Sequence, residues 1–269
     1  PDFFIYNDVV IEGPDGQLEF YCYPKEAFPP TDFHSATLVG DRVVIIGSLG
    51  YLENRRIGHT QVCLLDMDGY QLTCIDTHGE SPGWIHGQHA QLSADEMVIT
   101  LTGGQLYLGD QHSLRENIDD WALDLNTWAW KRLTERRWPR WEVLRVDRER
   151  LHLWDIRQAL WNQSVNWVEQ YEDSIKELAA ELGCEPQVSS VQDLYSFPFN
   201  DGRLNDDEEE YNLFWIYISG VKVRFVEEHF ALIVTVEGEL PKSTIRDLQH
   251  ALLERVSALE NTPCELQTY

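Results

Sequence analysis

One pattern of four short β-rich runs occurs twice in the chain, and this repetition constrains the fold more than any other feature. The runs are residues 35–39, 42–47, 60–66 and 71–76 in the first copy, and 89–93, 97–104, 120–125 and 128–133 in the second. Turn residues such as Gly40-Asp41 and Asp68-Gly69 separate the runs, as in an antiparallel meander. Both copies close with Pro-x-Trp, at Pro82–Trp84 and Pro139–Trp141. The offset of about 55 residues is within the range of propeller-type repeats.

The second copy resembles the Kelch repeat. It has a strand ending in Gly103-Gly104, a strand carrying Leu123-Asp124, and a last strand containing Trp130. The first copy departs from this pattern, with Gly47-Ser48 in place of Gly-Gly and no Trp in its last strand. The resemblance covers residues 30–142. It implies four-stranded blades around an axis, which usually bind other proteins through their loops.

The number of repeats limits the kind of propeller that we expect. A closed propeller normally has four to eight blades, whereas two are clear in this sequence. Residues 3–23 and 141–153 are candidates for further strands. We therefore expect Kelch-like four-stranded blades over residues 1–153, in a partial or small propeller whose exposed edges are covered by another segment.

The sequence changes in character after residue 153. Residues 154–161 and 165–182 are predicted to form a helical hairpin, because apolar residues in the second segment fall at helical spacing and Gly183 is a natural stop. Residues 184–210 have the composition of a loop and end in an acidic run. We therefore expect residues 154–210 to form a helical and loop connector.

The C-terminal residues 211–269 are predicted to form a small α+β unit. Three runs, 213–218, 221–226 and 230–236, are joined by short connectors and read as an antiparallel meander. Pro241 then opens a last helix, where its missing N–H costs nothing. The apolar residues of this helix fall on one stripe that should pack on the meander. The whole chain is thus expected to be mainly β with an α+β C-terminal part.

The composition limits the partners. The formal net charge is −25, which opposes binding to nucleic-acid phosphates and anionic membranes because both rely on Lys and Arg. It favours a basic protein partner, although solubility alone would also account for it. No apolar run reaches the length that crosses a bilayer, and no signal peptide is visible. Because the chain begins at Pro1 without Met, we expect that residues have been removed or precede it.

The cysteines suggest a location. Their number, five, is odd, and they show no CxxC or zinc spacing. Cys63, Cys74 and Cys264 lie in apolar strand-like runs, so we expect buried free thiols in a reducing cytoplasm.

We find no catalytic constellation and expect no cofactor or metal. The sequence lacks a phosphate-binding P-loop, a dinucleotide-binding glycine motif, a HExxH zinc motif and a nucleophile elbow. Some Kelch-type propellers are copper oxidases, but nothing here places the required Tyr, His and Cys together. An alternative is an enzyme or ligand-binding propeller with a site at the blade mouth, around His34, His86 and His89. Equivalent repeat positions of His34 and His89 favour a structural role instead.

Three segments are candidates for partner contacts. Long blade loops often carry function, and the loop at residues 50–59, whose counterpart is 105–117, offers Tyr51, Arg55, Arg56 and His59. A basic and aromatic cluster offers Arg137, Trp138, Arg140 and Trp141, which are residue types that dominate hot spots. The acidic run offers Asp206, Asp207 and Glu208 for attraction of a basic partner. Each segment could instead have only a structural role. The blade loop would then be a simple connector, the basic and aromatic cluster would be paired inside the fold, and the acidic run would be a solvated loop.

The function predicted from these observations is that of a non-catalytic protein-binding module. One narrower version is an acidic inhibitor or immunity protein for a basic partner. The alternatives are the propeller enzyme or ligand binder described above, and a scaffold segment of a larger protein.

Overall fold

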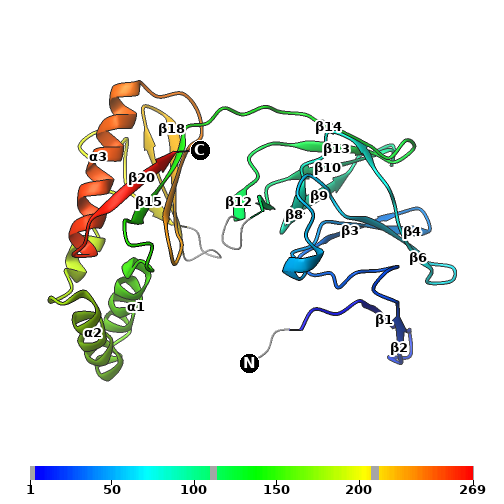
Figure 1. Ribbon diagram of the computed structural model, residues 1–269, viewed down its shortest axis with the longest axis horizontal. Helices are drawn as coiled ribbons and strands as arrows, with labels where there is room; N and C mark the ends of the chain where they lie inside the picture. The colour runs from blue at the N-terminus through cyan, green and yellow to red at the C-terminus, as the bar shows by residue number, and fades with distance from the viewer. Residues whose placement is uncertain (1–3, 110–113, 207–211, 269) are drawn as a thin grey trace. The chain divides into compact units, whose positions relative to one another are not determined.

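The computed structural model describes residues 4–109, 114–206 and 212–268. Strands hold 34% of the chain and helices 20%, which confirms the expected mainly β fold. The chain divides into two compact units, Pro1–Arg136 and Arg137–Tyr269 (Figure 1). Each unit has its own sheets and its own hydrophobic clusters.

The first unit contains two like four-stranded meanders. The strands are β3 (Ser35–Val39), β4 (Arg42–Ile46), β5 (Val62–Asp66) and β6 (Leu72–Cys74) in one, and β9 (His89–Leu92), β10 (Val98–Thr102), β13 (Trp121–Asp124) and β14 (Ala129–Arg132) in the other. Every consecutive pair is antiparallel. Ser35 is opposite Ile46 in the first meander, and Ala90 is opposite Leu101 in the second. These pairs occupy equivalent places in the two repeats, so the repeated sequence folds with a repeated register.

The two meanders share one hydrophobic cluster. Strands alternate their side chains between two faces, and the inward positions of both sheets are apolar. The buried members are Val44, Ile46 and Val62 from the first meander, and Ile99, Leu101, Trp121, Leu123 and Trp130 from the second. Burial of these side chains against one another is what holds the two sheets together.

Three smaller pieces complete the first unit. The hairpin of β1 (Asp8–Glu12) and β2 (Leu18–Cys22) forms a two-stranded sheet, and β8 (Trp84–His86), β11 (Gln105–Tyr107) and β12 (Leu114–Glu116) form a three-stranded one. The short strand β7 (His78–Gly79) pairs in parallel with β14. Within the described residues these sheets do not close into a barrel or a propeller.

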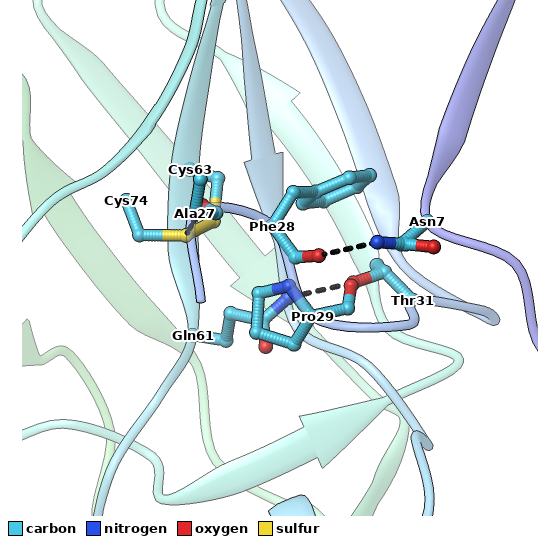
Figure 2. The surroundings of a disulfide bond; sticks show 8 residues. All are labelled: Asn7, Ala27, Phe28, Pro29, Thr31, Gln61, Cys63 and Cys74. Carbon is cyan, nitrogen blue, oxygen red and sulfur yellow. Dashed lines mark hydrogen bonds between the residues drawn. A yellow bond between two sulfur atoms is a disulfide. The ribbon is translucent and has the colours of Figure 1, made fainter. Parts of the chain in front are cut away.

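A disulfide joins two strands of the first meander. Cys63 on β5 and Cys74 on β6 are directly opposite each other and are bonded, with Cα atoms 3.9 Å apart. Figure 2 shows the bond beside Phe28, and Cys74 Sγ lies 3.3 Å from the Ala27 carbonyl oxygen. The expectation of free thiols at these two positions is therefore corrected, because pairing of β5 with β6 brings the cysteines face to face. Since disulfides are rare in a reducing cytoplasm, the cysteines no longer support the cytoplasmic location expected from the sequence.

Glycine is required after β4 and after β10 for the same structural reason. Gly47 has φ +79°, and a Cβ there would lie 2.5 Å from the Ile85 carbonyl oxygen. Gly104 has φ +82°, and a Cβ there would lie 2.7 Å from the His86 carbonyl oxygen. Both meanders therefore need glycine at this place because the backbone of β8 approaches them.

Replacing Gly47 with Ala is expected to lower the free energy of unfolding by about 2 kcal/mol or more. A left-handed backbone costs a residue with a Cβ roughly 1–2 kcal/mol, and the clash with β8 adds to this. Gly40→Ala is the matched control, because Gly40 also has positive φ but a Cβ there would meet nothing within 4 Å. Urea denaturation should show a clearly larger loss of free energy of unfolding for Gly47→Ala than for Gly40→Ala. Equal losses would contradict the close approach of the β8 backbone to Gly47.

The second unit is built on one six-stranded antiparallel sheet. Its order is β16 (Asn205–Asp206), β17 (Leu213–Ile218), β18 (Val221–Glu227), β19 (Leu232–Val236), β15 (Arg140–Arg145) and β20 (Cys264–Thr268). The middle of this order contains the meander expected from the sequence. Residues 137–153 were expected to continue the N-terminal blades, but β15 finds its hydrogen-bond partners in β19 and β20 of the C-terminal segment. The structural division therefore falls at residue 136, ahead of the expected boundary at 153.

In the part of this unit that the structure describes, three α-helices accompany the sheet. They are α1 (Leu153–Ser164), α2 (Val168–Leu182) and α3 (Lys242–Leu259), and α1 and α2 lie side by side as the predicted hairpin (Figure 1). Gly183 adopts the left-handed conformation that ends α2. The buried stripe of α3 joins the core of the sheet through Leu248, Leu252, Val256 and Leu259. No helix in the described part of the chain has the length and apolar character needed to cross a membrane.

One polar contact set ties the helices of the second unit together. The backbone N–H of His152, at the start of α1, donates to the Glu260 carboxylate at 2.9 Å. The two ring nitrogens of His152 lie 2.9 Å from Glu260 Oε2 and 3.1 Å from Glu181 Oε2. Because Glu260 follows α3 and Glu181 belongs to α2, this buried histidine links all three helices.

Candidate functional site

The long loops of the two meanders meet on the first unit. One loop joins β4 to β5 and the other follows β10. The Arg55 guanidinium of the first lies 5.3 Å from the centre of the Tyr107 ring on β11. A Cβ built at Gly109 would lie 2.6 Å from Ile57 Cδ1, which places these residues in direct contact. We call the exposed part of these loops the paired-loop surface, defined by Leu52, Arg56, Ile57, Leu108 and Leu114.

The first of these loops is held firmly by hydrogen bonds. Arg55 Nε and Trp84 Nε1 both donate to the Leu49 carbonyl, at 2.9 and 3.1 Å. Thr60 Oγ1 donates to the Gly83 carbonyl at 2.8 Å. Tyr51 begins a short 3₁₀ turn, and its hydroxyl accepts a hydrogen bond from the Ile5 N–H at 2.9 Å. Hydrogen bonds of this kind restrain a loop before binding, which lowers the entropy lost when a partner binds.

The paired-loop surface is apolar and exposed. Ile57 is 67% exposed and Leu108 41%, with Leu52 and Leu114 close behind. Exposed Arg56 lies beside Ile57 in the chain. Burial lowers the pKa of neighbouring His59, and the positive charge of Arg56 lowers it further. A rigid surface of apolar side chains with an adjacent arginine is well suited to contact with another protein.

The base of the second loop is fixed by a buried carboxylate, Asp119. It accepts hydrogen bonds from the Arg136 N–H at 2.7 Å and from the Arg132 guanidinium at 2.5 Å. Burial alone would raise the pKa of Asp119, but these two donors outweigh it and hold the pKa below its ordinary value. Asn117 Nδ2 donates to the Asp119 carbonyl at 2.8 Å and so closes the loop.

Asp119→Asn is expected to lower the free energy of unfolding of the first unit at pH 7. When the pH falls to acid values, the variant should lose less of this free energy than wild type does. The depressed pKa means that the stabilising contribution of Asp119 is present above its unfolded pKa of about 3.9 and is lost as pH falls through the folded pKa. Urea denaturation at pH 7 and at pH 3 should therefore show a larger difference between wild type and variant at pH 7. A difference that does not change with pH would contradict this role.

The histidines at the strand ends do not come together as a ligand set. His34 and His89 are exposed, whereas His86 is buried. Burial lowers the pKa of His86, and the positive charge of Arg55 lowers it further. His86 Nδ1 and Asp32 Oδ2 are buried without a hydrogen-bond partner. No group of three or more metal-binding side chains occurs among residues 4–109, 114–206 and 212–268.

The residues that the sequence assigned to partner contacts belong to both units of the chain. Tyr51, Arg55, Arg56 and His59 lie in the first loop, where Tyr51 and Arg55 act mainly as anchors. Asp206 is exposed on β16, and Asp207 and Glu208 lie outside the described residues.

The basic and aromatic cluster belongs to the second unit from Arg137 onward. Arg137 is exposed, and Trp138 and Arg140 are half-buried. Trp141 is 1% exposed in the core of that unit, so its assignment to a contact surface is corrected. The alternating pattern of β15 turns its ring inward, away from solvent.

Sequence reasoning missed the apolar members of the paired-loop surface. Ile57, Leu108 and Leu114 are ordinary aliphatic residues within polar segments, and their exposure depends on how the loops fold. The equivalence of the loops at 50–59 and 105–117 was the available signal that they belong to one surface. A scan against protein-family models and a search of curated proteins both find no match for this chain.

Proposed function

We propose that residues 4–136 form two Kelch-like blades of a partial propeller and bind another protein through the paired-loop surface. The observation that carries the proposal is that two loops at equivalent repeat positions touch, through Arg55 with Tyr107 and Ile57 with Gly109. Each loop also carries exposed apolar side chains. Contiguous exposed apolar side chains on a soluble domain commonly mark an interaction site.

The Kelch-like assignment is supported by the roles of the motif residues. The first meander has Leu65-Asp66 where the second has Leu123-Asp124. Asp66 and Asp124 each accept hydrogen bonds from the backbone of the turn that follows. Trp130 is 4% exposed within the cluster that the two meanders share. These residues thus form a tight turn in each of the two meanders and a packed last strand in the second.

We propose a basic protein as the partner. The net charge of −25 attracts a basic protein at long range and speeds its encounter. The paired-loop surface itself carries Arg56, so the apolar contacts, and not ion pairs, would supply most of the affinity there. An acidic inhibitor or immunity protein for a basic partner is the narrower form of this proposal, and the acidity is its support.

Capture experiments with matched variants test the proposal. Wild-type chain immobilised on resin is compared with Ile57→Asp and with Leu38→Asp, a control at an exposed β3 residue of similar exposure (61%). A partner from the source cells should be retained by wild type and by Leu38→Asp, and reduced at least tenfold with Ile57→Asp. Equal recovery on all three resins would contradict binding through these loops.

A second candidate function is binding of a small polar ligand at the strand ends. The supporting observation is that His86 Nδ1 and Asp32 Oδ2 are both buried without partners. A crystal structure of the wild-type chain would test this candidate. Density for a small molecule bound to both atoms would support it, and ordinary water or direct pairing there would remove it.

A further inference from the structure

The tip of the α1–α2 hairpin presents an aromatic pair to solvent. Trp161, near the end of α1, and Trp167, just before α2, have ring centres 5.1 Å apart and meet edge to face. They are 49% and 50% exposed. Val165 and Val168 beside them are 38% and 59% exposed. We call these four residues the hairpin tip.

The hairpin tip is not part of the core that stabilises the second unit. The buried residues of α2 are Leu178 and Leu182, at the opposite end of that helix. In α1 the buried apolar residues are Leu153, Ile156 and Ala159, which precede Trp161. Large exposed side chains that contribute little to folding are typical of contact residues, and Trp is the type most enriched at binding hot spots.

Acidic side chains extend from the hairpin tip along α2. Glu169, Glu172, Asp173 and Glu177 are all exposed. Lys176, the one lysine of this helix, lies 3.2 Å from Asp173 and so pairs with a neighbour of its own. Along the helix axis, Glu169, Glu172 and Asp173 lie within two turns of Trp167, at a rise of roughly 3–9 Å.

We propose that the hairpin tip and the acidic face of α2 form a docking site for a basic polypeptide segment. Lys or Arg side chains of such a segment would pair with the carboxylates and stack on the indole faces through cation–π contacts, while its apolar side chains cover Val165 and Val168. This site lies on the second unit and does not depend on the paired-loop surface.

Charge complementarity selects this occupant over others. A second copy of the chain would bring the same acidic helix and a further −25 charge against the first, which is repulsive. Anionic lipid and nucleic acid are opposed for the same reason.

The test uses the full chain and a labelled helical peptide of alternating Lys and Leu residues, with a Glu-for-Lys peptide as its matched control. Fluorescence anisotropy should show salt-sensitive binding of the Lys peptide, and none of the Glu peptide. The double variant Trp161→Ala/Trp167→Ala and the charge-reversal variant Glu169→Lys/Glu172→Lys should each weaken binding at least tenfold. Glu254→Lys, at a 70% exposed side chain on α3, should bind within twofold of wild type, and so should Ile57→Asp.

Three outcomes would overturn the docking site. The first is unchanged peptide binding in both Trp161→Ala/Trp167→Ala and Glu169→Lys/Glu172→Lys while circular dichroism shows them folded. The second is dimerisation of wild type, by light scattering, that is lost in the Trp variant. The third is binding to phosphatidylcholine vesicles that is lost in the Trp variant. If Ile57→Asp still binds the peptide, the docking site on the hairpin is independent of the paired-loop surface of the first unit.

Discussion

Replacing Glu227 with Gln is expected to lower the free energy of unfolding of the second unit by about 3–5 kcal/mol, because it leaves a buried guanidinium without a counter-charge. Glu227 is 3% exposed. Its Oε2 accepts a hydrogen bond from Arg157 Nε, and its Oε1 accepts one from the Tyr195 hydroxyl, both at 2.5 Å. The Arg157 guanidinium also lies 4.2 Å from the centre of the Phe214 ring, so turning out to solvent would cost it this contact as well.

A double replacement distinguishes the cost of leaving one buried charge unpaired from the cost of removing both charges. Arg157→Met/Glu227→Leu removes both charges and keeps apolar volume, so it should recover most of the stability that Glu227→Gln loses. Hydrogen exchange followed by mass spectrometry measures the two units separately, with the loss expected in peptides from residues 137–268. Protection equal to wild type in Glu227→Gln would show that the ion pair does not hold this core.

Trp130→Ala is expected to lower the free energy of unfolding of the first unit by about 3–5 kcal/mol, as is usual when a large buried aromatic side chain is replaced with alanine. The ring is 4% exposed in the cluster that both meanders share, and its Nε1 donates to Thr77 Oγ1 at 3.1 Å. Trp130→Phe should lose less, because it retains much of the apolar volume. The exposed Trp161→Ala is the control and should change stability by less than about 0.5 kcal/mol.

Hydrogen exchange again assigns the effect to a unit. Trp130→Ala should weaken protection in β4 and β10 together, because residues of both strands pack in one cluster with Trp130. A loss of protection from exchange that is confined to β13 and β14 would mean that the two meanders are stable independently. The two meanders would then not share one core.

Local patterns predicted much of the fold. The turn residues and alternating apolar runs located the eight strands of the two meanders, and the helical spacing from Val165 to Leu182 located α2 with its stop at Gly183. These elements depend on neighbouring residues, which a single sequence contains. The meander from Leu213 to Val236 was found for the same reason.

Contacts between distant segments were not predictable in the same way. Cys63 and Cys74 look like ordinary apolar strand residues until β5 and β6 pair in a register that places them opposite each other. The pairing of β15 with β20 joins segments more than a hundred residues apart, and nothing local in residues 140–145 indicates that partner. The candidate site shows the same limit, since the meeting of Arg55 with Tyr107 is a consequence of how two whole repeats pack.

Hydrogen exchange of the captured complex decides whether the paired-loop surface is where the protein contacts its partner. Peptides that cover residues 48–60, 105–109 and 114–117 should exchange more slowly in the complex than in the free chain, whereas β1 and β2 should not change. Slower exchange in the second unit alone, with the loops unaffected, would contradict the claim.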